Sequence, residues 1–161
     1  MENQTERLRV NVGGARNIAR RLLKDSRIKE IPVSLWKIIE YLKPQHELEV
    51  LRFPLEAVDG ILVVHEGLPT IGFNPSTAWV RRRFTIAHEI GHLLLGHTCT
   101  DPDLDNDPEA EANQFAAELL MPLALLKVDY KAKPDATCLA EKYIVSREAM
   151  ILHLMECRLF K

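Results

Sequence analysis

The sequence has little that would point to a secreted or membrane-bound protein. It holds three cysteines among 161 residues, Cys99, Cys138 and Cys157, and no CxxC pair. An odd number of cysteines without paired spacing indicates reduced thiols and not a disulfide framework. No apolar run approaches the about 18–20 residues that span a bilayer, and the N-terminus lacks the apolar stretch of a signal peptide. We therefore expect a cytoplasmic protein that does not associate with membranes.

Charge of one sign is also lacking. The chain carries 21 basic and 23 acidic residues, for a formal net charge of -2. A dedicated nucleic-acid binder usually shows a basic stripe, so no direct contact with nucleic acid is expected. The length and the 47% hydrophobic content suit one ordinary globular domain with a core of its own.

Helix and strand signals follow one another in three blocks. Helical spacing predicts helices at 15–25 and 32–42, the second opened by Pro32 and ended by Lys43-Pro44. Short apolar runs bounded by turn residues predict strands at 48–53, 60–65 and 69–73, with Glu66-Gly67 as a hairpin turn. A further helix is predicted at 77–95, ended by Gly96, and an acidic loop follows at 98–108. Three more helices are predicted after it, from Pro108 to Pro122, at 139–143 and at 147–157. This order argues for an α+β fold.

Two helix faces can be assigned from the same spacing. In the helix at 32–42, the buried face is predicted from Val33, Trp36, Ile39 and Leu42 or Tyr41. In the helix at 15–25, a basic face of Arg16, Arg20 and Lys24 is expected to be solvated.

The chemical signal of the chain is His88-Glu89-Ile90-Gly91-His92, an HExxH inside the helix predicted at 77–95. Residues four apart lie about 40° apart around a helix, so both imidazoles can converge on one ion. Zinc prefers such nitrogen ligands in tetrahedral geometry. Glu89 follows the first ligand, so its carboxylate can act as general base without binding the metal. Burying this carboxylate in an apolar helix also calls for a partner, which a metal would supply.

A catalytic zinc site needs a third protein ligand. His97 is a poor candidate, because on a continued helix it lies about 140° around the axis from His92; the residue is better explained as part of a helix C-terminal cap. Glu109 is favoured, since Asn113 shares its helix face and can orient a ligating histidine. Glu111 is the fallback, although its position about 200° from Glu109 means that the two cannot both face the metal.

Two separated motifs together resemble the ImmA/IrrE metallopeptidase family. They are the segment from Phe84 to His92 and the segment from Glu109 to Pro122, EAEANQFAAELLMP. The resemblance covers roughly residues 30–160. It implies a small zincin-like core in which a short sheet packs on the HExxH helix, beside a second ligand-bearing helix and a C-terminal helical pair. It also implies a Zn²⁺ site of His88, His92 and Glu109, and a protein substrate that is a helix-turn-helix repressor.

On this resemblance we divide the single domain at 1–161 into three parts. Residues 1–30 form an N-terminal helical extension, 31–130 the catalytic core and 131–161 a C-terminal helical subregion. The expected activity is that of a zinc metallo-endopeptidase, with Glu89 taking a proton from the attacking water. A further donor should stabilise the oxyanion, and the sequence leaves four candidates open. They are His65, Tyr130, Tyr143 and His153. Arg81-Arg82-Arg83 is either a solvated helix start or a docking patch for an acidic substrate or nucleic acid.

Two other classes of protein remain as alternatives. The first is a protein- or DNA-binding regulatory module without peptidase activity, because the segment from Leu139 to Met150 resembles a helix-turn-helix. Its would-be recognition helix has few positive charges, Arg147 and Arg158, which disfavours DNA binding. The second is a deformylase-like hydrolase with a cysteine ligand. Such enzymes place the cysteine upstream of the HExxH, whereas every cysteine here lies downstream.

Overall fold

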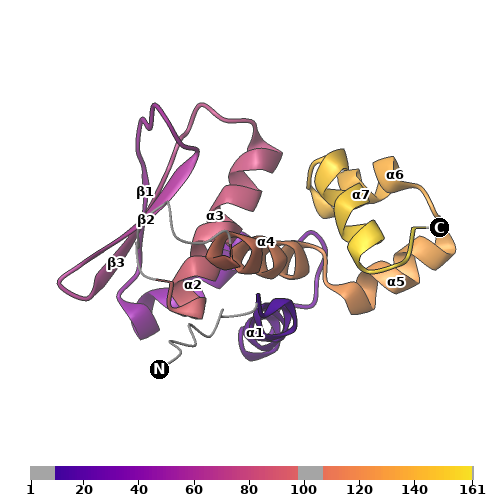
Figure 1. Cartoon of the computed structure of the whole chain (residues 1–161), viewed down its shortest axis with the longest axis horizontal. Coiled ribbons are helices and arrows are strands. Elements are labelled where there is room, and N and C mark those ends of the chain that lie inside the picture. Colours follow the sequence, from indigo (N-terminus) through magenta and orange to yellow (C-terminus); the bar gives the residue numbers. More distant parts are fainter. Residues whose placement is uncertain (1–9, 98–106, 161) are drawn as a thin grey trace, which may run out of the picture.

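The computed structural model describes residues 10–97 and 107–160. Within these ranges the chain forms helices and one small mixed sheet, which lies at one side of the molecule in Figure 1, so the α+β expectation is confirmed. The helices are α1 (Val12–Asp25), α2 (Leu35–His46), α3 (Trp79–Leu95), α4 (Asp107–Leu120), α5 (Leu123–Ala132), α6 (Ala136–Tyr143) and α7 (Arg147–Glu156). The strands are β1 (Glu49–Arg52), β2 (Gly60–His65) and β3 (Leu68–Phe73). The acidic loop predicted at 98–108 lies almost wholly outside the described residues, as does Cys99.

The sheet has the order β1-β3-β2, with β1 parallel and β2 antiparallel to the central strand β3. The predicted hairpin turn is confirmed, and Glu66 and Gly67 both have positive φ, 50° and 80°. That pair of left-handed residues gives the turn a twist that matches the flanking strands. Leu62 and Ile71 point into the core, while Ile61 and Val63 of the same hairpin are exposed. One face of the sheet therefore packs on α3 and the other faces solvent.

Helices α3 and α4 form the centre of the molecule. Helix α3 packs against β2 and β3 on one side and against α4 on the other. Gly91 allows this close packing: a Cβ there would lie 2.9 Å from the ring of Phe115 and 3.3 Å from the Cα of Ala112. The predicted inward face of α4 is confirmed, with five residues at 0% exposure. They are Ala112, Phe115, Ala116, Leu119 and Leu120.

Helix α2 differs from its prediction at both ends. It begins at Leu35, where Ser34 caps the N-terminus, and this start places Leu35, Ile38, Ile39 and Leu42 on the buried face. Trp36 was wrongly assigned to that face and is 63% exposed. Pro44 does not end the helix, which continues to His46. The preference against helix before proline is overridden here because Leu42 and Leu48, on either side, are both buried in the core.

Helices α5, α6 and α7 pack together at one end of the molecule (Figure 1). Helix α5 was not predicted; only Leu126 in it is fully buried, so its apolar spacing is weak. The turn between α6 and α7 is confirmed, with Ile144 left-handed and Ser146 capping α7. Tyr143 is buried and donates a hydrogen bond to Asp129 across the group, 2.8 Å away.

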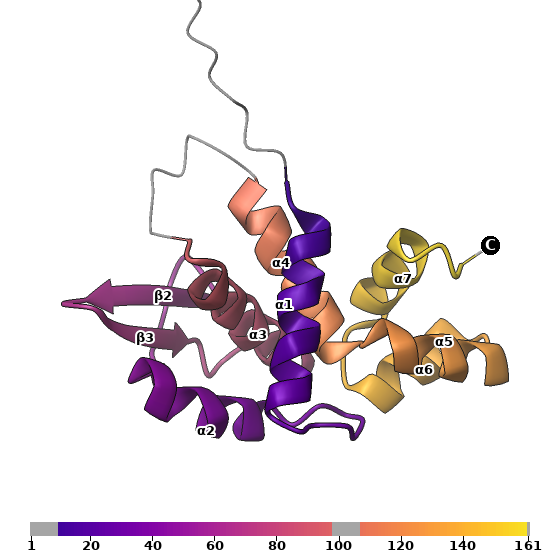
Figure 2. The same cartoon turned by 90° about the horizontal axis from the view of Figure 1, so that it is seen from below.

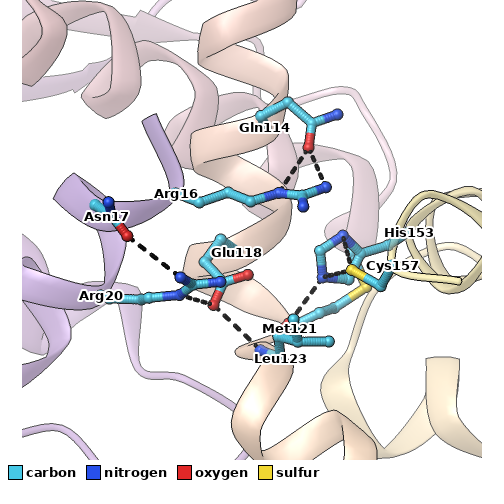
Figure 3. Close-up of polar contacts among 9 residues, drawn as sticks. All are labelled: Arg16, Asn17, Arg20, Gln114, Glu118, Met121, Leu123, His153 and Cys157. Atoms are coloured by element: carbon cyan, nitrogen blue, oxygen red, sulfur yellow. Dashed lines mark hydrogen bonds and ion pairs between the residues drawn. The ribbon is translucent and has the colours of Figure 1, made fainter. Parts of the chain in front are cut away.

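Polar contacts join α1, α4 and α7 (Figure 3). Arg20 forms an ion pair with the buried carboxylate of Glu118, with Nε 2.8 Å from Oε1, and Arg16 donates to Gln114. In α7, the buried ring of His153 lies 3.0 Å from the carbonyl oxygen of Met121. The expectation of a solvated basic face on α1 is wrong for Arg16, whose side chain is 17% exposed, because α1 lies along α4 (Figure 2). Arg20 and Lys24 are exposed as expected, although Arg20 also reaches Glu118.

None of the helices in the described part of the chain is long and apolar enough to cross a membrane. A single cluster of buried apolar residues runs from Ala15 to Leu154 and includes members of α1, the sheet and α7. The division into three subregions stays a prediction.

Candidate metal centre

The structure brings together His88, His92 and Glu109. The two histidines lie one turn apart on α3, with their Nε2 atoms 2.9 Å apart. Glu109, in the first turn of α4, places one carboxylate oxygen 3.1 Å from Nε2 of His88 and the other 3.0 Å from Nε2 of His92. The carboxylate bridges the two rings because α4 crosses α3 closely at Gly91.

This triangle fits a divalent cation. One ligand atom from each residue lies within 4.8 Å of the others, and the closest pairs are 2.9–3.1 Å apart. Ligands at about 2.0–2.1 Å from a tetrahedral ion are about 3.3 Å from one another. Glu109 is 62% exposed while both histidines are largely covered, so solvent and a substrate can reach one side of the triangle. Two imidazoles, one carboxylate and an open side make up the donor set of a catalytic metal site.

Asn113 orients the first histidine. Its side-chain oxygen lies 2.8 Å from Nδ1 of His88. An amide oxygen only accepts, so Nδ1 donates and the lone pair of the neutral ring lies on Nε2, facing the triangle. The amide that the sequence placed on the same face as Glu109 is thus in the expected position.

Glu89 lies on the same helix as the histidines and is turned toward β2. Its side chain is buried, and this burial, with the negative charge of Glu109 as a smaller cause, raises the pKa of Glu89 to about 7. A hydrogen bond from the backbone N–H of Leu62 acts in the opposite direction. Gly60 lets the strand come this close, because a Cβ there would meet the side chains of Thr85 and Glu89. A carboxyl that titrates near neutrality suits proton transfer at physiological pH.

Neither His97, the disfavoured third ligand, nor Glu111, the fallback, is in the ligand triangle. The structure instead places Nδ1 of His97 2.9 Å from Nδ1 of His92, and Nε2 of His97 3.0 Å from a carboxylate oxygen of Glu111. The expectation that His97 faces away from His92 is wrong because α3 ends at Leu95. Gly96 is left-handed (φ 70°) and turns the chain back toward the helix. The predicted stop at Gly96 was the signal that could have found this contact.

Two of the four candidate oxyanion donors are engaged elsewhere. Tyr143 donates to Asp129, and His153 contacts the carbonyl of Met121. Tyr130 is half-buried on α5, and His65 is exposed at the end of β2.

The three arginines that precede the HExxH make contacts within the chain. Arg83 is buried and donates to the carbonyl oxygens of Val33 and Ile144. Arg82 donates to the carbonyls of Pro75 and Thr77, and the Nε of Arg81 lies 2.6 Å from the carboxylate of Asp59. Neither a solvated start nor a docking patch describes the buried Arg83; it connects α3 to the turns beside it.

A cavity of about 650 Å³ adjoins the site between α3, α4 and α7. Asn113, whose side chain contacts His88, lines it, whereas His88, His92 and Glu109 do not. Its walls are largely apolar, with Phe84, Ala117 and Leu152, and its rim carries Glu148. A cavity of this kind, beside the N-terminal half of α3, can hold apolar side chains of a polypeptide.

Comparison with known proteins agrees with this geometry. A mycobacterial structure, a Mycobacterium tuberculosis transcriptional regulator, superposes with a TM-score of 0.64 at 16% identity. The superposition covers 86% of this chain and 45% of that one, so this chain spans less than half the length of that structure and shares its fold. A search of curated proteins found no match. The model of a peptidase family, described as the IrrE N-terminal-like domain, matches residues 44–155, a stretch that contains both the HExxH helix and Glu109. The chain belongs to this family of IrrE N-terminal-like peptidase domains, and the resemblance read from its two motifs is confirmed.

Proposed function

We propose that the protein is a zinc-dependent endopeptidase that cleaves a helix-turn-helix transcriptional repressor. One observation carries the proposal: His88, His92 and Glu109 converge within hydrogen-bond distance of one another while the buried Glu89 lies beside them. A metal site that only stabilised a fold would need no buried carboxylate next to its open side.

The proposed roles follow from the chemistry of each side chain. His88, His92 and Glu109 would hold Zn²⁺, which when bound polarises a peptide carbonyl and makes water a stronger nucleophile. Glu89 takes the proton of the attacking water and passes it to the leaving amine. Burial raises the pKa of this carboxyl in the metal-free fold, which helps it to hold the proton between the two halves of that transfer. Asn113 keeps the His88 ring oriented.

Strand β2 offers a place for an extended substrate. It is an edge strand, and the N–H of Leu62 points away from β3 to the carboxyl of Glu89. Since polar groups alternate along an antiparallel ladder, those of Val64 are directed to the same edge. A peptide that added to this edge would bring a backbone carbonyl close to Glu89 and to the metal ligands. Its side chains could enter the cavity lined by Phe84 and Leu152.

A repressor as substrate is supported by the family and by the regulator with the same fold. Repressors act where the gene is transcribed, which agrees with a cytoplasmic protein. The alternative is a metal-containing regulatory module that binds its partner without cutting it. The two functions differ in their need for Glu89.

The test uses purified, zinc-loaded full-length protein and repressors encoded by neighbouring genes. Incubation with the wild type should produce a new N-terminus on one repressor, detected by mass spectrometry. Glu89→Gln should lower the cleavage rate by about 10²–10⁴-fold while the repressor still binds. Glu40→Gln, which removes an exposed carboxylate on α2, is the matched control and should cut at the wild-type rate. If Glu89→Gln relieves repression as well as the wild type does, the binding-module function replaces the peptidase.

A further inference from the structure

A chain of hydrogen bonds extends outward from His92 and ends at α1. It starts at the C-terminus of α3, where the N–H of Gly96 bonds to the carbonyl of Leu93 and that of His97 to the carbonyl of His92. This pair of bonds around a left-handed glycine is the Schellman motif. It fixes the backbone of His97 directly against the last turn of α3. The His97 side chain therefore has a defined position and is only 13% exposed.

The direction of each bond is set by Glu111. A carboxylate only accepts, so Nε2 of His97 donates across the 3.0 Å contact to Glu111 Oε2. In a neutral ring the other nitrogen, Nδ1, then accepts. The partner of that nitrogen is Nδ1 of His92 at 2.9 Å, which must donate. The lone pair of His92 is thereby placed on Nε2, the atom that faces His88 and Glu109.

Glu111 is itself held in place from α1. Its second oxygen accepts a 2.7 Å hydrogen bond from the backbone N–H of Asn11, the N-cap residue of α1. The side chain of Asn11 caps the same helix by accepting from the N–H of Gly14. A carboxylate at a helix N-terminus is favoured by the helix dipole. The carboxylate of Glu111 thus has a protein partner on each oxygen, and its side chain is 19% exposed.

We propose that His97 and Glu111 are positioning residues that fix the ring and tautomer of His92 for metal binding, and that α1 completes this support through Asn11. The inference rests on the proposed metal site and adds to it. His88 receives its orientation from one amide, Asn113, whereas His92 receives it from a histidine and a carboxylate in series. Partners of this kind raise the basicity of a ligating imidazole and stabilise its orientation.

The direct test is nuclear magnetic resonance of the zinc-loaded, ¹⁵N-labelled wild type. The proposed N–H···N bond should give a scalar coupling between Nδ1 of His92, which carries the proton, and Nδ1 of His97, whose own ring proton should be on Nε2. A His97 ring protonated on Nδ1 and uncoupled from His92 would overturn the proposal. This measurement needs no variant, so it holds even if a substitution impairs folding.

Chelator competition with zinc alone provides the second readout. His97→Leu should weaken zinc binding about 10–100-fold. His97→Gln should recover most of that loss, because an amide can accept from His92 and donate to Glu111 at once. The double variant His97→Leu/Glu111→Gln should bind zinc about as weakly as His97→Leu alone. Both substitutions interrupt the same series of hydrogen bonds, so their effects on zinc affinity should not add. His46→Leu, at a histidine in the last turn of α2 that has no role in the site, is the matched control.

The outcomes separate the two proposals. A wild type that binds no zinc removes the metal site and the proposed function with it. A wild type that binds zinc, with His97→Leu binding it equally well, overturns the positioning role and leaves the metal site in place.

Discussion

Replacing Glu89 by glutamine should stabilise the metal-free protein, and more so as the pH rises. The carboxyl ionises near 4.5 in an unfolded chain and at about 7 in the fold, because burial disfavours its charge. Between these values the unfolded state has lost a proton that the folded state keeps, so raising the pH favours unfolding. The stability contributed by the neutral carboxyl is complete below pH 4.5 and is lost as the pH passes 7. Each pH unit between the two pKa values lowers the free energy of unfolding by about 1.4 kcal/mol, which gives a total loss of about 3 kcal/mol.

Glutamine has the same shape and can still accept from the N–H of Leu62, but it carries no charge to bury. Urea unfolding of both proteins with a strong chelator present measures the difference. The advantage of Glu89→Gln should grow by about 2–3 kcal/mol between pH 5 and pH 8. Groups common to both proteins cancel in this comparison, and Glu40→Gln should follow the wild type at each pH. A difference that stays constant over this range would refute the reasoning, because Glu89 would then ionise in the fold as it does in the unfolded chain.

Three further substitutions test other parts of the structure. His92→Ala should reduce bound zinc from about one equivalent to a trace in elemental analysis while the circular dichroism spectrum stays helical; a full equivalent would show that the ligands are wrongly assigned. Gly91→Ala should weaken zinc binding about tenfold in a chelator competition. The new Cβ must displace Phe115 and push α4 away from α3, an overpacking that costs about 1–3 kcal/mol. Unchanged zinc affinity would mean that α4 is free to move. Arg83→Met should lower the free energy of unfolding by about 2 kcal/mol or more while zinc binding persists, since two carbonyls lose their donor; a surface docking residue would show no such loss in urea unfolding.

The parts of the fold that the sequence predicted are those set by local rules. Gly96 stops α3 and Glu66-Gly67 turns the hairpin, because both need backbone conformations that few residues adopt. The spacing of His88 and His92 fixes their geometry by helix periodicity alone. The face of α4 could be assigned because its apolar residues recur at helical spacing.

The errors arose where distant contacts decide the outcome. Trp36 is apolar and correctly spaced, yet the packing of α2 on the core starts one residue earlier and leaves its ring outside. Helix α5 is supported by one buried leucine, so its pattern carries too little apolar periodicity to detect. Neither the contact of His97 with Glu111 nor that of Arg20 with Glu118 has a local signature, because each pair is brought together by the tertiary fold.

A domain boundary taken from the family match, at residue 44, would cut through the folded unit. Helix α1 lies before that boundary, and its Ala15 and Ala19 are completely buried in the common core. A fragment that began at residue 44 would expose to water the apolar side of α4 that α1 covers, and Glu118 would lose Arg20, its ion-pair partner. Such a fragment should be insoluble even though it keeps every metal ligand. The unit that can be expressed, exchanged or fused to another protein therefore includes α1.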